Sequence, residues 1–167
     1  MKNDEDDSDG MAELADGPEA RDRRATSSLA AGFIPRFSAT HDLNRVVAEV
    51  VDASFQIHTD LGPGLLESTY ERILERALQR RGIEVRRQQY CDFVYDGLLF
   101  RRALRLDLLV EDSIVVELKA ERALQRAHQR QVVSYLRLLN LRLGLLINFG
   151  APRLKQGFRR IINPDLW

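Results

Sequence analysis

Residues 105–120 read RLDLLVEDSIVVELKA, in which two apolar runs flank the polar triplet EDS. This pattern predicts a β-hairpin. Asp107 lies in the first arm, and Glu117 and Lys119 lie two positions apart in the second arm, so that the last two side chains point to the same face of the strand. Two carboxylates and an amine gathered in this way could hold a divalent metal beside a proton-handling or charge-stabilising group.

A simpler interpretation is that Glu117 and Lys119 belong to the solvated polar face of a strand, where charged side chains commonly form pairs. Two observations favour a functional site. The apolar flanks indicate strands buried on both faces, where an unpaired charge is costly. The chain also has 22 Arg and only three Lys among its 25 basic residues, so Lys119 departs from the general composition. A compact ammonium suits a position beside a reacting phosphate.

The length of the hairpin loop decides whether the two acids share a face. A three-residue loop, 111–113, pairs Val110 with Ile114 and brings Asp107 opposite Glu117. A two-residue loop would shift the register by one and separate the acids, because a one-residue slip reverses every side chain. A β-bulge could restore the shared face after a two-residue loop, but we predict the three-residue loop.

Length and charge indicate one folded domain with an acidic extension. The chain has 167 residues, 44% of them hydrophobic, and a formal net charge of zero. Residues 1–24 hold nine acids and four bases, whereas residues 25–167 hold sixteen acids and twenty-one bases. We predict a disordered acidic tail over 1–38 and a domain over 39–167. The mildly basic remainder is compatible with a phosphate-rich partner.

Several classes of protein are excluded or disfavoured by composition. The single cysteine, Cys91, rules out an intramolecular disulfide and a zinc site built from several cysteines, and it is interpreted as a packing residue. The N-terminus lacks the features of a secretory signal, and no apolar run approaches the length of a membrane span. A cytoplasmic protein with no membrane partner is therefore expected.

Apolar periodicity and turn residues predict the order of elements. Thr40 is expected to cap the first helix, and Gly82 is expected to end the second. The expected helices cover residues 41–59, 67–81 and 121–140, and the expected strands cover residues 83–89, 91–95, 98–102, the two hairpin arms, 141–148 and 156–162.

Five segments resemble, in order and spacing, the motifs of the GxxExxY family. In the first, HTDLGPGLLESTY, Gly64, Glu67 and Tyr70 fill the named positions. The segments are residues 58–70, 107–110, 117–120, 131–136 and 144–150. The family is placed in the PD-(D/E)XK nuclease-like superfamily. The resemblance covers about residues 42–163 and implies an α/β single domain, with a restriction-endonuclease-like mixed central β-sheet flanked by helices.

The resemblance also implies roles for particular residues. Asp107 and Glu117 correspond to metal-binding acids, and Lys119 corresponds to the lysine of the signature. Glu67 corresponds to an additional acid that reaches the metal, often through water. Gln131 corresponds to a polar residue that contacts the site or the substrate. Hard oxygen ligands of this kind favour Mg²⁺ or Mn²⁺.

The implied function is a metal-dependent nuclease that hydrolyses phosphodiester bonds of DNA or RNA. Nucleic acid is the expected partner, and a homodimer is a further expectation. The alternative is a non-catalytic nucleic-acid-binding or protein-interaction module on the same fold. The chain departs from the signature at Leu106, where the superfamily often has proline.

Other candidate residues are interpreted structurally. His58 follows the apolar stripe of the first helix and is expected to be a hydrogen-bonded core or helix-end residue, whereas His41 and His128 are expected to be solvated. A group of arginines forms either a phosphate-binding strip or the wet face of a sheet, and both interpretations stay open. These are Arg86, Arg87, Arg101, Arg102 and Arg105.

Overall fold

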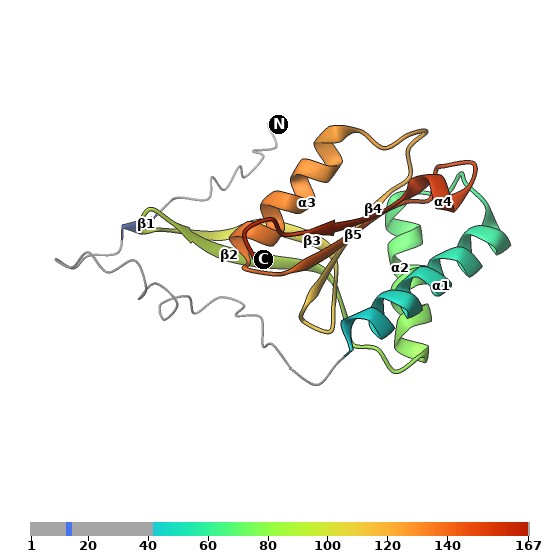
Figure 1. The fold of residues 1–167 in the computed structure, drawn as a ribbon, viewed down its shortest axis with the longest axis horizontal. Helices are drawn as coiled ribbons and strands as arrows, with labels where there is room; N and C mark the ends of the chain where they lie inside the picture. Colours follow the sequence, from blue (N-terminus) through green and yellow to red (C-terminus); the bar gives the residue numbers. More distant parts are fainter. Residues whose placement is uncertain (1–12, 15–41, 167) are drawn as a thin grey trace, which may run out of the picture.

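Apolar runs in the second half of the chain form a mixed six-stranded sheet, with helices against both faces (Figure 1). The computed structural model describes residues 13–14 and 42–166. The elements are β1 (Glu13–Leu14), α1 (Leu43–Leu61), α2 (Glu67–Arg80), β2 (Val85–Tyr95), β3 (Leu98–Val110), β4 (Ile114–Lys119), α3 (Arg126–Leu138), β5 (Leu143–Asn148), α4 (Leu154–Gly157) and β6 (Phe158–Ile162). The predicted α/β fold with a mixed central sheet is confirmed.

The sheet runs in the order β3, β4, β5, β6, and both β1 and β2 pair with β3. Only β4 and β5 are parallel among these strands, and α3 makes the crossover between them. All the other described pairs are antiparallel. The crossover helix therefore starts at the same end of the sheet at which β4 ends.

Two apolar clusters lie on opposite faces of the sheet. Helices α1 and α2 cover one face, where Val50 and Leu74 belong to the same buried cluster as Val116. Helix α3 covers the other face, where Leu136 and Val115 are buried together (Figure 1). All six residues of β5 are buried, as its continuous apolar run predicted.

The hairpin has the predicted register. Val110 pairs with Ile114 and Leu108 pairs with Val116, which confirms the three-residue loop. The backbone ladder stops at Leu108. One residue earlier, the carboxylate of Asp107 accepts a hydrogen bond of 2.9 Å from the Leu118 N–H. A side chain thus replaces the next ladder bond, at the place where β3 and β4 separate.

The predicted ends of the first helix and of the strands over 83–102 are wrong. Helix α1 is capped by the side chain of Asp42, which accepts from the Asn44 N–H, and it continues to Leu61. Thr40, the predicted cap, lies outside the described residues. The short strands predicted over 83–102 are instead parts of two long strands, β2 and β3. Each long strand continues through a residue with an irregular backbone conformation. Gln88 and Arg102 have positive φ angles of 53° and 50°.

The predicted starts of α3 and the last strand also differ from the structure. Helix α3 begins at Arg126 because Gln125 and His128 form a capping box there. The strand expected from Gln156 begins at Phe158, after the short helix α4. In contrast, Gly82 follows the last turn of α2 as predicted, with a φ of 74° and an N–H that donates to Gln79.

The predicted acidic tail lies outside the described residues, except for Glu13 and Leu14. These two residues form β1, which pairs with Leu98 and Leu99 at the start of β3 and which the sequence did not predict. No helix within the described ranges is long and apolar enough to cross a membrane.

Candidate functional site

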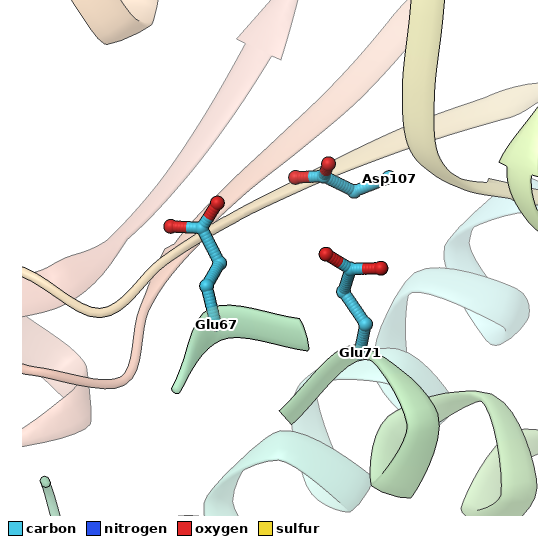
Figure 2. A group of neighbouring side chains, drawn as sticks. All are labelled: Glu67, Glu71 and Asp107. Carbon is cyan, nitrogen blue, oxygen red and sulfur yellow. The ribbon is translucent and has the colours of Figure 1, made fainter. Parts of the chain in front are cut away.

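Three acidic side chains from two elements meet beside the point where β3 and β4 separate. Glu67 and Glu71 extend from the first turns of α2 toward Asp107 of β3 (Figure 2). One carboxylate oxygen of each lies within 4.8 Å of the other two. The helical spacing explains the pair on α2, since residues four apart lie on the same face.

Two of these acids are nearly inaccessible to water. Asp107 is 7% exposed and Glu71 is 3% exposed. Burial, together with the charges of Glu117 and Glu71, raises the pKa of Asp107 to about 7, against the lowering effects of the Leu118 N–H and Lys119. Ionisation of Asp107 in the fold therefore costs free energy that a bound cation would offset.

Glu117 is buried still more completely, with 2% of its surface exposed. Its Oε1 accepts a hydrogen bond of 2.8 Å from Lys119 Nζ, whereas its Oε2 is buried and has no hydrogen-bond partner among the described residues. Burial raises the pKa of Glu117, although Lys119 and the amide of Gln131 lower it. A buried carboxylate oxygen without a partner is a candidate ligand atom.

Lys119 lies between Glu117 and the acidic cluster of Glu67, Glu71 and Asp107. Its Nζ lies 2.8 Å from Glu117 Oε1 and 3.7 Å from Glu67 Oε1. Burial by itself would lower the pKa of Lys119, but the hydrogen bond to Glu117 and the charges of the surrounding acids raise it overall. The side chain therefore stays protonated at neutral pH, and its positive charge can stabilise a negative charge beside it.

The glycine-rich turn before α2 places Glu67 at the first residue of that helix. Gly64 has a φ of 125°, a conformation that L side chains rarely adopt. The hydroxyl of Tyr70 donates to the Gly62 carbonyl at 2.6 Å and accepts from the Leu65 N–H at 3.3 Å. The glycine and tyrosine of the motif are thus structural residues that fix the position of Glu67.

A second clamp fixes the chain just after Lys119. The side chain of Asn148 accepts from the N–H groups of Glu121 and Gly150 and donates to the Glu121 carbonyl. The Phe149 N–H also donates to the Lys119 carbonyl at 2.7 Å. The end of β5 therefore determines where β4 delivers its lysine.

Glu71 is the member of the cluster that sequence reasoning missed. Gln88 donates to its carboxylate at 2.6 Å, and Arg87 lies 3.5 Å from the same oxygen. The available signal was its spacing, one helical turn after Glu67 on the same face. An Asp or Glu on a helix is usually solvated, and only the position of β2 shows that this one is buried.

The remaining candidates have structural partners. Gln131 donates to the Tyr135 hydroxyl at 3.1 Å, in addition to its effect on Glu117. His58 bonds to the Ala151 carbonyl through Nε2 at 2.8 Å, as expected of a helix-end residue. His128 is half-buried in the capping box, so the expectation that it is solvated is wrong. His41 lies outside the described residues, and Cys91 is buried as predicted.

The predicted arginine strip is divided among several partners. Arg86 pairs with Glu84 and Asp112, whereas Arg87 pairs with Glu71 and Glu75. The guanidinium of Arg102 lies 4.1 Å from the centre of the Tyr90 ring. These contacts tie much of the strip to the protein itself, which favours its interpretation as a sheet surface.

The residues fit a hard divalent cation. All the candidate ligand atoms are carboxylate oxygens, which suit Mg²⁺ or Mn²⁺ and not a soft metal. The partnerless Oε2 of Glu117 and the crowded oxygens around Asp107 are the features that a cation would satisfy. The resemblance predicted Glu67, Asp107 and Glu117 together as metal ligands. In the structure, the close cluster consists of Glu67, Glu71 and Asp107. Glu117 is linked to this cluster through Lys119, which lies near both Glu117 and Glu67.

The fold and the site define a nuclease-like α/β protein, as the resemblance implied. Residues 44–161 match the PD-(D/E)XK nuclease superfamily among known protein families, and the chain belongs to that superfamily. A search of curated proteins and a search of solved structures gave no significant match. The finer assignment to the GxxExxY family stays a prediction.

Proposed function

We propose that this protein is a metal-dependent nuclease that hydrolyses phosphodiester bonds in DNA or RNA. Membership of the nuclease superfamily and the acidic cluster support this proposal. The single observation that carries it is the buried convergence of Asp107, Glu117 and Lys119, with one carboxylate oxygen left unpartnered. A domain kept only for binding would gain nothing from burying these charges.

In this proposal Asp107 and Glu117 hold Mg²⁺ or Mn²⁺, and Glu67 and Glu71 complete the acidic surround. A bound cation of this kind activates water and neutralises charge on phosphoryl oxygens. Lys119, whose raised pKa keeps it protonated, stabilises the charge that develops on the scissile phosphate. Gln131 lies beside Glu117 and lowers the pKa of its carboxyl, which favours the ionised form that a cation would need.

The Leu118 N–H has a defined part in this arrangement. It donates to Asp107 Oδ2 and so fixes one oxygen of the carboxylate. The same carboxylate lies beside the two acids of α2. The hydrogen bond also ties the first arm of the hairpin to the second, so that the two acids and the lysine keep their relative positions.

Cleavage assays test the proposal. The purified full chain is incubated with single- and double-stranded DNA and RNA in Mg²⁺, Mn²⁺ or EDTA. We expect metal-dependent cleavage of at least one substrate, reduced by about 10²-fold or more in Lys119→Ala, which is of the size seen when one transition-state-stabilising group is lost. Arg80→Ala, an exposed basic residue on α2, should retain activity.

Two results would contradict the proposal. Cleavage that is unchanged in Lys119→Ala would place the activity in a contaminant or another site. Retention of nucleic acid without cleavage of any substrate would favour the non-catalytic binding module. The homodimer expected from sequence gains no support from the fold or the family membership, and a cytoplasmic location stays a prediction.

A further inference from the structure

One half of the domain carries basic residues without acidic ones. Residues 122–164, the basic half, contain nine Lys or Arg and no Asp or Glu, whereas residues 42–121 contain eleven Lys or Arg and fifteen Asp or Glu. The basic residues of this half are Arg122, Arg126, Arg130, Arg137, Arg142, Arg153, Lys155, Arg159 and Arg160. A compositional preference for Arg over Lys explains which base occurs, but it does not explain why acids are missing.

Part of this charge is gathered in space as well as in sequence. Helix α3 packs against β5 and β6, whereas α4 lies against β5 and α1, on the other face of the sheet (Figure 1). All nine basic residues are exposed. The formal net charge of zero therefore conceals a basic segment, residues 122–164, whose charge is offset by the acids in the rest of the chain.

The basic half leaves its charges largely uncompensated. Arg137 pairs with Asp165, which is the one ion pair with an acid that the structure shows for these nine residues within the described ranges. In the other half, arginines such as Arg81 lie between two acids. A surface of a single sign repels itself, and it attracts a partner of opposite charge.

The N-terminal half of α3 shows this imbalance most clearly. Arg126 and Arg130 lie four residues apart and so repel each other across one helical turn. Arg126 is also the first residue of α3, where the helix dipole favours an acid, and the first turn of α3 contains none. Helix α2 follows the usual preference, with Glu67 in its first turn and Arg80 in its last.

The same surface adjoins the candidate site. Gln131, the residue that follows Arg130, lies close enough to Glu117 to lower the pKa of that carboxyl. Across the sheet, Glu117 pairs with Leu146, and Leu146 pairs with Arg159. Side chains in one such row point to the same face, so Arg159 lies on the same side of the sheet as Glu117, two strands or about 10 Å away.

We propose that the part of the basic half formed by α3 and β6 binds the phosphate backbone of nucleic acid, with Arg126, Arg130 and Arg159 contacting the phosphates nearest the site. The inference rests on the proposed function and adds to it the surface over which the substrate runs. Charge complementarity identifies the partner, because closely spaced phosphates are the polyanion that releases counterions when arginines neutralise them.

Binding assays without metal test this surface independently of cleavage. The affinity of the full chain for labelled single- and double-stranded DNA is measured by fluorescence anisotropy in EDTA over a range of salt. For Arg126→Gln/Arg130→Gln we expect at least tenfold weaker binding at low salt. The slope of log affinity against log salt should fall by about 1.4 for single strands and about 1.8 for duplex, which corresponds to two lost phosphate contacts.

The matched control is Arg72→Gln/Arg76→Gln on α2. It removes the same charge from two exposed residues with the same spacing, but in the other half of the domain. We expect its affinity to stay within twofold of the wild type. Circular dichroism and thermal melting establish that both double variants are folded.

Equal losses of DNA affinity in the two double variants would overturn the proposal, because they would show that affinity responds to net charge alone. An unchanged salt slope in Arg126→Gln/Arg130→Gln would overturn it as well. The two proposals fail separately. Absence of cleavage with a selective loss of binding would remove the nuclease function and keep this surface, whereas cleavage with no selective loss would do the reverse.

Discussion

At the scale of single residues, Asp107 is an acid that the fold holds in conflicting surroundings. Its carboxylate accepts a hydrogen bond from the Leu118 N–H, yet burial and the neighbouring charges of Glu117 and Glu71 oppose its ionisation. This conflict supports the proposed cation site. It also makes the stability of the metal-free protein depend on pH.

The pKa of Asp107 is raised from 3.8 to about 7, so the folded state binds its proton more tightly than the unfolded state does. Its contribution to stability is therefore present below about pH 4 and is lost as the pH rises through about 7, with an upper limit of ~4 kcal/mol. Asp107→Asn cannot ionise. In EDTA, its free energy of unfolding relative to the wild type should increase between pH 5 and pH 8, as measured by urea denaturation.

Mg²⁺ added at pH 8 should reduce the free energy of unfolding of Asp107→Asn relative to the wild type, because it stabilises only the wild type. A difference between the two proteins that stays constant from pH 5 to pH 8 would show that Asp107 ionises normally in the fold.

Glu71 provides a second test at this scale. Because its carboxylate lies in the acidic cluster, Glu71→Gln should weaken Mn²⁺ binding by about tenfold, the lower end of the range for supporting groups of a metal site. Glu75→Gln, one turn further along α2, should change it less than twofold. Isothermal titration calorimetry measures both, and equal affinities in the two variants would remove Glu71 from the site.

Sequence reasoning identified Asp107, Glu117 and Lys119 because strand alternation and an unusual lysine are visible in the residues themselves. It did not find Glu71, whose burial depends on contacts with Gln88 and Arg87 from a different element. The roles of Asp107, Glu117 and Glu71 in binding metal stay predictions until the variants are measured.

At the scale of elements, the hairpin register and the ends of β5 and α2 position the site. The register was predictable, because the loop triplet and the buried runs allow only one pairing that keeps the acids together. The start of α3 was not predictable, since residues 121–125 have helical composition. Their backbone is instead held by the side chain of Asn148, which lies 27 residues from Glu121 in sequence.

Gly150 tests the importance of this clamp. A Cβ at this position would lie 2.3 Å from the Glu121 carbonyl oxygen and 2.6 Å from its nitrogen, so the backbone must move. Gly150→Ala should cost about 1–3 kcal/mol of unfolding free energy and reduce any metal-dependent activity, because the displaced segment follows Lys119.

Urea denaturation measures the effect, and Pro152→Ala, an exposed change in the same loop, serves as the control. Unchanged stability in Gly150→Ala would show that the contact between β5 and residue 121 is loose.

At the scale of the whole molecule, the order of the motifs was sufficient to predict a mixed sheet between helices. The separation of charge was hidden, because net charge averages an acidic half with a basic one. The long β2–β3 pairing was also hidden, since positive φ angles at Gln88 and Arg102 interrupt the alternation that a sequence pattern relies on.

The account as a whole requires that the buried carboxylates converge on one cation. Mn²⁺ soaked into crystals and located by anomalous scattering tests this most directly. We predict a peak about 2.0–2.2 Å from carboxylate oxygens of Asp107 and Glu117, with Glu117 Oε2 among the ligands. A map with no peak at this position, in crystals that bind Mn²⁺ elsewhere, would contradict the account.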